Sequence, residues 1–225
     1  MSTFYAPELQ LGALHYQLSE EESKHCIKVL RLQPGAEIEL INGKGLQAIA
    51  SLQDAHPKRS MLHIEQFVEH APTASLHVAM APTKNLDRLE WFVEKATELG
   101  ITHLSFLLCD HSERRQLNIE RLEKIAIAAI KQSKRFYLPQ ISQMQRFDEY
   151  IARAPKGYFG HCAPGPKMSM KSLQKGLPFL IGPEGDFSSR EIELALACGF
   201  RAVDMSPFRL RTETAALLAT TALMD

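Results

Sequence analysis

The sequence predicts an α/β protein in which a small β-rich part precedes a parallel sheet covered by helices on both faces. Short alternating runs such as "AEIELING" and "SMLHIEQFVEH" dominate residues 1–70, and a period of two is typical of strands. From about residue 74, short apolar runs alternate with segments that carry an apolar stripe at helical spacing. Strands too apolar to be half-exposed, joined through helices, are typical of a parallel sheet that is buried on both sides.

The chain has 225 residues, and its 26 Lys and Arg balance its 26 Asp and Glu. A neutral chain is not drawn to nucleic acid by its overall charge, although local basic clusters such as Arg114 with Arg115 remain. Every apolar run is shorter than the roughly 20 residues that span a membrane, and the N-terminus lacks the basic start and apolar core of a secretory signal. We therefore expect a cytoplasmic protein without a membrane segment.

The cysteines and histidines give no pattern of a metal site. Cys26, Cys109, Cys162 and Cys198 form no CxxC pair and have no histidine at zinc-site spacing, and the nine histidines lack an HExxH pattern. We expect reduced, partly buried thiols and no bound metal.

In the first part, the segment "SEEESKHCIKVLR" predicts one short helix. Its Ser19 and Glu22 fit a capping box, and Pro34-Gly35 ends it. Asn42-Gly43 lies between two alternating runs, and Asn-Gly is a strong signal for a β-hairpin. We expect a small β-barrel with one helix, followed by a linker at "EHAPTAS".

In the second part, strands and helices alternate. The helix "NLDRLEWFVEKATELG" begins at the cap Asn85 and ends at Gly100, and "NIERLEKIAIAAIKQSK" begins at Asn118. Two more helices are expected at "SSREIELALAC" and "TETAALLATTALMD". The expected strands are "SLHVAM", "ITHLSFLL", "KGYFGHC", "LPFLI" and "RAVDM".

The loop "GPEGDF", residues 182–187, leaves the strand "LPFLI" and enters a helix whose Ser188 and Glu191 fit a second capping box. Open α/β sheets bind ligands at the carboxyl ends of their parallel strands. The loop alone leaves three interpretations open: a phosphate site at a helix N-terminus, a tight turn that uses glycine, and a different ligand held by backbone groups. Glu184 and Asp186 would repel a phosphate, and no GxGxxG or P-loop pattern is present.

A second loop of the same kind follows the strand "RAVDM". The segment "SPFRLRTETAALL" holds two arginines, a proline and Thr-Glu-Thr at a helix start. Two such loops from strands near each other in sequence can face one another around a ligand, which favours a ligand site over a simple turn.

The segment "IGPEGDFSSREIELALACGFRAVDMSPFRLRTETAALLA" resembles the C-terminal signature of the RsmE family, the 16S rRNA uridine N3-methyltransferases of the SPOUT superfamily. "TKNLDRLEWFVEKATELGITHLSFLLCDHSERR" is similar to the family's central segment, and "IAAIKQSKRFYLPQI" to its glutamine-serine-x-arginine segment. The first part is similar to the family's PUA-like RNA-binding domain through "HCIKVLRLQPGAEIELINGKG". Asp186 and Ser206 stand where the family often has glycine, and Lys131 where glutamate is frequent.

The resemblance implies an S-adenosylmethionine-dependent methyltransferase that acts on N3 of one uridine in the 16S rRNA of the small ribosomal subunit. It implies a PUA-like β-barrel domain at residues 1–70 and a SPOUT domain at 74–225, whose parallel sheet ends in a trefoil knot. It also implies a homodimer with the site near the interface. The residues that it places around the cofactor are Leu180, Ile181, Gly182, Glu184, Gly185, Met205, Ser206, Leu210 and Arg211.

Methyl transfer to uracil N3 requires that the imide proton leaves or that the developing anion is stabilised. A cationic arginine near the carbonyl oxygens lowers the pKa of the imide, and a carboxylate can take the proton. Arg211 and Arg135 are the candidates for contacts with uridine or phosphate, and Glu213 is a candidate base, although a structural role is favoured for it. Alternatively, Arg211 forms a salt bridge with Glu213, and Arg135 is part of a solvated helix end. Glu184 binds cofactor hydroxyls or holds the loop.

The residues expected to contact RNA are Lys84, Arg88, Arg114, Arg115 and Lys134. Lys84 and Arg88 are cations at a helix N-terminus, where the helix dipole disfavours them, and this favours a functional role. Trp91 and Phe92 are expected in the core. Three other functions stay open: a SPOUT enzyme with another RNA target, such as a ribose 2′-O-methyltransferase, a non-catalytic RNA-binding assembly factor, and a phosphate-binding nucleotide enzyme, which the acidic loop disfavours.

Overall fold

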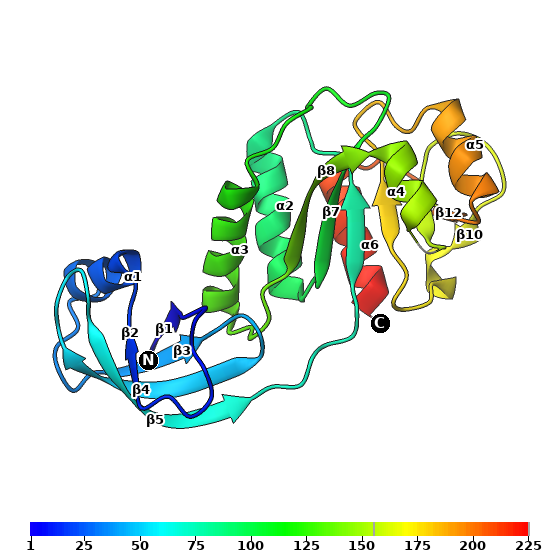
Figure 1. The fold of residues 1–225 in the computed structure, drawn as a ribbon. Coiled ribbons are helices and arrows are strands. Elements are labelled where there is room, and N and C mark those ends of the chain that lie inside the picture. Colours follow the sequence, from blue (N-terminus) through cyan, green and yellow to red (C-terminus); the bar gives the residue numbers. More distant parts are fainter. Residues whose placement is uncertain (155, 225) are drawn as a thin grey trace. The chain divides into compact units, whose positions relative to one another are not determined.

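The computed structural model describes residues 1–154 and 156–224, which Figure 1 draws as a ribbon. Among the helices of these residues, none combines the length and the apolar character that a bilayer-spanning segment requires.

The chain divides into two compact units. The first consists of Met1–Pro72 and Ile127–Leu138, and the second of Thr73–Ala126 and the chain from Pro139 onward. The sequence-based division into residues 1–70 and 74–225 stays a prediction, and it differs from these units in assigning residues 127–138 to the second part.

The first unit contains a five-stranded sheet in the order β1-β3-β4-β5-β2. Its strands are β1 (Ser2–Tyr5), β2 (His15–Gln17), β3 (Glu37–Ile41), β4 (Leu46–Asp54) and β5 (Met61–Glu69). The hairpin expected at Asn42-Gly43 joins β3 to β4, which pair antiparallel. The Asn42 side-chain oxygen accepts hydrogen bonds from the backbone N–H groups of Lys44 and Leu46 at 2.8 and 3.0 Å, and this fixes the turn.

The expected helix of this unit is α1 (Glu20–Lys24), which continues as a π-helical turn, His25–Val29. Its capping box is only half formed. Ser19 accepts the Glu22 backbone N–H at 3.2 Å, but the Glu22 carboxylate accepts the Tyr5 N–H at 3.2 Å and pairs with Lys131 at 2.6 Å. The last residues of the helix Ile119–Ser133 belong to the first unit, and this ion pair joins them to α1. The lysine at position 131 therefore has a carboxylate partner.

The second unit confirms the expected parallel sheet. Its strand order is β10-β12-β9-β11-β6-β7-β8, and every pairing is parallel. The strands are β6 (His77–Met80), β7 (His103–Leu108), β8 (Gln140–Arg146), β9 (Tyr158–Gly160), β10 (Met168–Ser169), β11 (Phe179–Ile181) and β12 (Arg201–Asp204). The central strands are buried on both faces, as Val78, Phe106, Phe159 and Leu180 illustrate.

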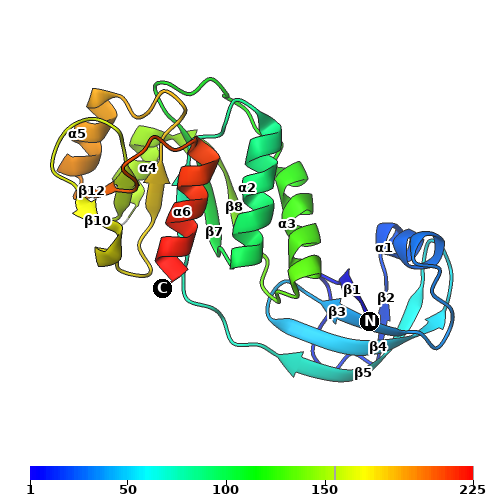
Figure 2. The same ribbon diagram turned by 180° about the vertical axis from the view of Figure 1, so that it is seen from behind.

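Helices cover both faces of this sheet. Figure 2 shows α2 (Leu86–Leu99) and α6 (Thr212–Met224) packed together on one face, while α4 (Phe147–Arg153) and α5 (Ser189–Ala197) lie on the other (Figure 1). The remaining helix, α3, is Ile119–Ser133. Asn85, Asn118 and Ser188 cap α2, α3 and α5 as expected, and Gly100 ends α2 in the left-handed conformation.

The structure adds two elements to those expected and corrects one residue. The polar edge strand β8 and the short helix α4 were not expected, because "QISQMQR" lacks the apolar run of a central strand and α4 has only seven residues. The expectation of a core position for Trp91 was wrong: its side chain is 43% exposed, whereas Phe92 is fully buried. Neighbouring helix positions point about 100° apart, so Phe92 can face the core while Trp91, one position earlier, reaches solvent.

Candidate functional site

The two loops singled out in the sequence line one cavity in the second unit. A cavity of about 440 Å³ is bordered by the end of β11 and the loop after it, at residues 181–184 and 186, and by the end of β12 and the segment after it, at residues 203–213. A third segment, residues 160–162 at the end of β9, also lines the cavity, together with Arg88 from α2, Lys167 and Ala215. Because β11, β9 and β12 are adjacent and parallel, their carboxyl ends bring these segments to the same edge of the sheet.

Seven of the nine residues expected around a cofactor line this cavity: Ile181, Gly182, Glu184, Met205, Ser206, Leu210 and Arg211. The other two do not. Leu180 is fully buried in the core beneath the loop, and Gly185 turns its carbonyl oxygen to the His111 ring at 3.1 Å. Arg88 and Glu213 also line the cavity, although Arg88 was expected to contact RNA and Glu213 to act in catalysis.

Asp186 fixes the shape of the first loop. Its backbone has φ +65°, a left-handed conformation that glycine adopts freely and that aspartate tolerates better than most residues. Its carboxylate accepts the N–H of Phe187 at 2.8 Å and the N–H of Cys162 at 2.7 Å. Aspartate at a position where glycine is frequent therefore keeps the turn and adds a link to the segment after β9.

Glu184 holds the same loop to the start of α2. One carboxylate oxygen accepts the Lys84 backbone N–H at 2.9 Å, just before the helix cap Asn85. This contact fits the alternative in which Glu184 braces the loop, while its position in the cavity wall leaves the second oxygen near a ligand.

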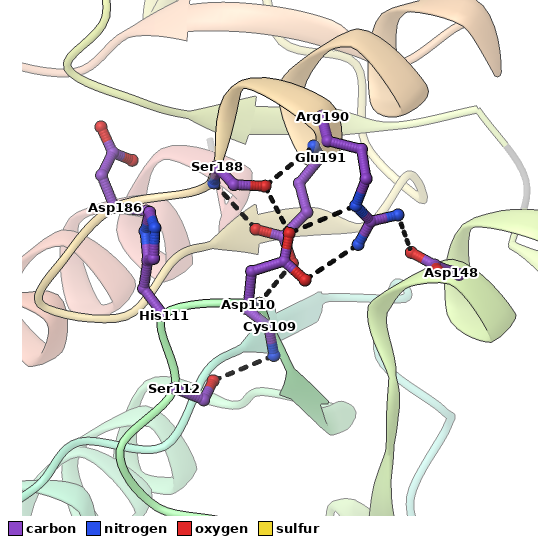
Figure 3. Close-up of polar contacts among 9 residues, drawn as sticks. All are labelled: Cys109, Asp110, His111, Ser112, Asp148, Asp186, Ser188, Arg190 and Glu191. Atoms are coloured by element: carbon purple, nitrogen blue, oxygen red, sulfur yellow. Dashed lines mark hydrogen bonds and ion pairs between the residues drawn. The ribbon is translucent and has the colours of Figure 1, made fainter.

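A polar network fastens the loop and α5 to the end of β7 (Figure 3). The fully buried Glu191 accepts the N–H groups of Asp110 and Ser188, each at 2.9 Å, so it closes the expected capping box and also binds the segment after β7. The Ser188 hydroxyl donates to Asp110 at 2.6 Å. His111 Nδ1 lies 3.1 and 3.0 Å from the carbonyl oxygens of Gly185 and Asp186, so Nδ1 carries the proton.

Glu213 pairs with Arg88 at 3.7 Å, and its side chain is largely buried at the start of α6. The alternative in which Arg211 pairs with Glu213 is therefore wrong. Within the described residues, the exposed Arg211 guanidinium has no ion-pair partner, so its charge stays available to a ligand in the cavity.

His161 and Cys162 are cavity residues that the sequence reasoning missed. His161 Nδ1 is buried, and among the described residues it has no hydrogen-bond partner. Burial, with the nearby Lys167 charge, lowers the pKa of His161, which favours the neutral imidazole. The signal that could have found them is their position in the last two places of "KGYFGHC", at the carboxyl end of the buried parallel strand β9.

The other basic residues named from the sequence lie outside this cavity. Lys84 pairs with Glu113 at 2.8 Å, and Arg114 donates to the carbonyl oxygens of Thr83 and Lys84. Arg115 lies on the same loop as Arg114. Lys134 and Arg135 follow α3 in the first unit.

No cluster of three or more His, Cys, Asp or Glu side chains placed to hold a metal ion occurs in the part of the chain that the structure describes.

Comparison with known proteins assigns both parts of the chain. A family model described as an RNA methyltransferase domain matches residues 69–224, and one described as an RNA methyltransferase PUA domain matches residues 18–64. The ribosomal RNA small subunit methyltransferase E of Bacillus subtilis (strain 168) is 30% identical over 92% of this chain and 89% of its own. The protein of the same name from Aquifex aeolicus (strain VF5) is 27% identical over the full length of both chains.

Solved structures of similar fold have names that agree with these sequence relatives. A probable rRNA-methyltransferase from Porphyromonas gingivalis superimposes with a TM-score of 0.89 at 33% identity, over 98% of this chain and 96% of that one. A ribosomal RNA small subunit methyltransferase E from Neisseria gonorrhoeae, bound to S-adenosyl methionine, superimposes with a TM-score of 0.87 at 26% identity, over 99% of this chain and 96% of that one.

Proposed function

Because this chain belongs to the RNA methyltransferase family, with relatives among the ribosomal RNA small subunit methyltransferases E, we propose that it methylates N3 of one uridine in 16S rRNA. S-adenosylmethionine is the methyl donor, and the small ribosomal subunit is the substrate. The observation that carries the proposal is the cavity between the loops after β11 and β12, in a fold whose Neisseria gonorrhoeae neighbour is bound to S-adenosyl methionine.

The residues around the cavity fit this cofactor. A cavity of about 440 Å³ suits a nucleoside-sized ligand. Glu184 and Asp186 in the wall disfavour a phosphate but tolerate a ligand with hydroxyl groups and a positive sulfur. Backbone groups of Gly182 and side chains of Ile181 and Leu210 would hold the cofactor, which supplies an activated methyl group when bound.

The chain's own residues act on the acceptor. The Arg211 guanidinium, which carries an unpaired charge at the cavity, stabilises the negative charge that develops on the uracil carbonyl oxygens. Glu213 positions Arg88 through their ion pair, and we keep it as the candidate proton acceptor. Arg135 and Lys134, in the first unit, are kept as candidate contacts to the RNA substrate.

The proposal includes a trefoil knot in the C-terminal chain and a homodimer. The adjacency of β9, β11 and β12, with all three following segments at one cavity, supports the knot. The half-exposed Trp91 on α2, beside an α6 that is apolar around most of its circumference, supports a protein partner on that face. The cytoplasm is the compartment in which such a protein meets ribosomal subunits.

Transfer of a labelled methyl group tests the function. The protein is incubated with labelled S-adenosylmethionine and either small subunits from a strain that lacks this gene, large subunits, or buffer alone. We expect label in the small-subunit rRNA only. A non-catalytic assembly factor would bind the subunits without transferring label, and a different RNA target would place label elsewhere or nowhere.

A further inference from the structure

A second, smaller hollow of about 180 Å³ lies at the carboxyl ends of β7 and β8, in the same unit as the cofactor cavity. Its wall contains the guanidinium groups of Arg115, Arg146 and Arg190 and the carboxylates of Asp110 and Asp148. The hollow shares no lining residue with the cofactor cavity.

Both carboxylates of the hollow, those of Asp110 and Asp148, form ion pairs with Arg190. Arg190 donates to Asp110 at 3.0 and 3.2 Å and to Asp148 at 3.0 Å, as Figure 3 shows. The hydrogen bonds from Arg190, together with the one from Ser188, lower the pKa of Asp110, so this carboxylate stays ionised and bound to its partner. Arg115 and Arg146 have no ion-pair partner within the described residues, so their charges remain for a ligand.

The wall of the hollow is held by buried neighbours. Arg146 directly precedes α4, whose first residue Phe147 is 2% exposed, and Arg190 lies in the first turn of α5 beside the fully buried Glu191. The ion pairs of Arg190 join these two helices to the segment after β7. A site built on fixed elements loses little conformational entropy when an anion binds.

The positive charge continues from this hollow towards the cofactor loop. Arg115 also lines a neighbouring hollow with Arg114, Gln116 and the ion pair of Lys84 with Glu113. The Arg114 guanidinium forms no ion pair among the described residues, and its hydrogen bonds go to backbone carbonyl oxygens. The backbone of Lys84 is hydrogen-bonded to Glu184 in the wall of the cofactor cavity. The charges of Arg114 and Arg115, which have no ion-pair partner in the part of the chain that the structure describes, therefore extend the positive character of the hollow towards the segment that Glu184 contacts.

We propose that the hollow with Arg115 and Arg146 binds a backbone phosphate of the RNA substrate, on the strand that carries the target nucleotide. Arginine forks match the geometry of a phosphate, and phosphate contacts set the register of a nucleic acid on a protein. This inference rests on the proposed function, since it assumes an RNA substrate, and it adds Arg146 to the expected contacts.

The test compares R115A and R146A with wild type and with R153A, which removes an exposed arginine from the other end of α4. Binding of labelled small subunits is measured at several salt concentrations, S-adenosylmethionine binding by calorimetry, and folding by thermal melting. We expect R115A and R146A each to weaken subunit binding several-fold and to reduce the slope of log K against log salt by about 1, as for one lost phosphate contact. All three variants should bind S-adenosylmethionine as tightly as wild type, and R153A should also bind subunits with the wild-type affinity and salt slope.

Equal salt slopes for R115A, R146A and R153A would overturn the proposal. A further arm adds inorganic phosphate to wild type and R146A: a hollow that takes free phosphate only would change phosphate binding in R146A and leave subunit binding intact, which also overturns it. Methyl transfer by wild type in the same preparations separates the two hypotheses. If wild type transfers no methyl group, the proposed function is contradicted. If wild type transfers methyl groups normally and R146A binds subunits as wild type does, only this inference is contradicted.

Discussion

The Asp186 carboxylate accepts a hydrogen bond from the Cys162 backbone N–H at 2.7 Å, and this contact joins two of the segments that wall the cavity at the ends of β9, β11 and β12. D186G would relieve left-handed strain of about 1 kcal/mol but lose two hydrogen bonds to a carboxylate, each about 1.5–3 kcal/mol. We predict a loss of stability of about 2 kcal/mol or more, and about five- to tenfold weaker S-adenosylmethionine binding by calorimetry. D186N keeps one acceptor oxygen, so its affinity for S-adenosylmethionine should lie between those of wild type and D186G. A wild-type affinity in D186G would show that the hydrogen bond between Asp186 and Cys162 does not shape the site.

Glu191 is the buried carboxylate on which the loop and the end of β7 both depend. In E191Q, one of the two backbone N–H groups at Asp110 and Ser188 loses its acceptor. We predict a loss of about 1–3 kcal/mol in the free energy of unfolding, measured with urea, because a buried donor is left unpaired. E193Q changes an exposed glutamate on the same helix and should stay within about 0.5 kcal/mol of wild type. Similar losses for both variants would contradict the role of Glu191.

Arg211 should matter for catalysis and little for folding. Its side chain is exposed and has no ion-pair partner among the described residues, so R211A should change stability by less than about 0.5 kcal/mol. Loss of one charge-stabilising donor predicts a fall in kcat of about 100-fold or more. R211K keeps the charge but loses the planar fork, so partial activity is expected. Steady-state kinetics with small subunits measure both, and undiminished kcat in R211A would refute the assignment.

His77 should make the protein acid-sensitive. Its ring lies 3.0 Å from the Ser105 hydroxyl and near the His103 ring, and burial, aided by His103, lowers its pKa from 6.5 to about 4. Above pH 6.5 neither state binds this proton. Between pH 6.5 and 4 the unfolded chain binds this proton and the folded chain does not. The free energy of unfolding therefore decreases by about 2–3 kcal/mol when the pH is lowered from 7 to 4.5.

Urea unfolding at pH 7 and pH 4.5 measures this effect. The loss on acidification should be smaller by about 2 kcal/mol in H77Q than in wild type, because glutamine cannot bind the proton. Equal losses in the two proteins would show that His77 contributes nothing to the pH dependence.

Features that depend on neighbouring residues could be predicted from the sequence. The caps Asn85 and Ser188 act within one helical turn, so their pattern alone locates the starts of α2 and α5. The two cavity loops were recognisable because each directly follows a buried parallel strand. The edge strand β8 was missed, since a half-buried strand without an apolar run looks like a loop.

Features that depend on distant residues could not be predicted. Glu191 was predicted as a capping residue, but its contact with Asp110 crosses 81 positions of the chain. The partner of Glu213 is Arg88 on another helix rather than the nearby Arg211. Glu22 leaves its capping box for Tyr5 and Lys131, which no local pattern reveals.

The most direct test of the proposed function is the identity of the methylated nucleoside. Small subunits from a strain without this gene are incubated with the protein and S-adenosylmethionine, and their 16S rRNA is digested and analysed by mass spectrometry. We expect 3-methyluridine to be absent before incubation, to appear at about one per subunit with wild type, and to fail to accumulate with R211A. Methyl groups on ribose or on another base, or no 3-methyluridine at all, would contradict it.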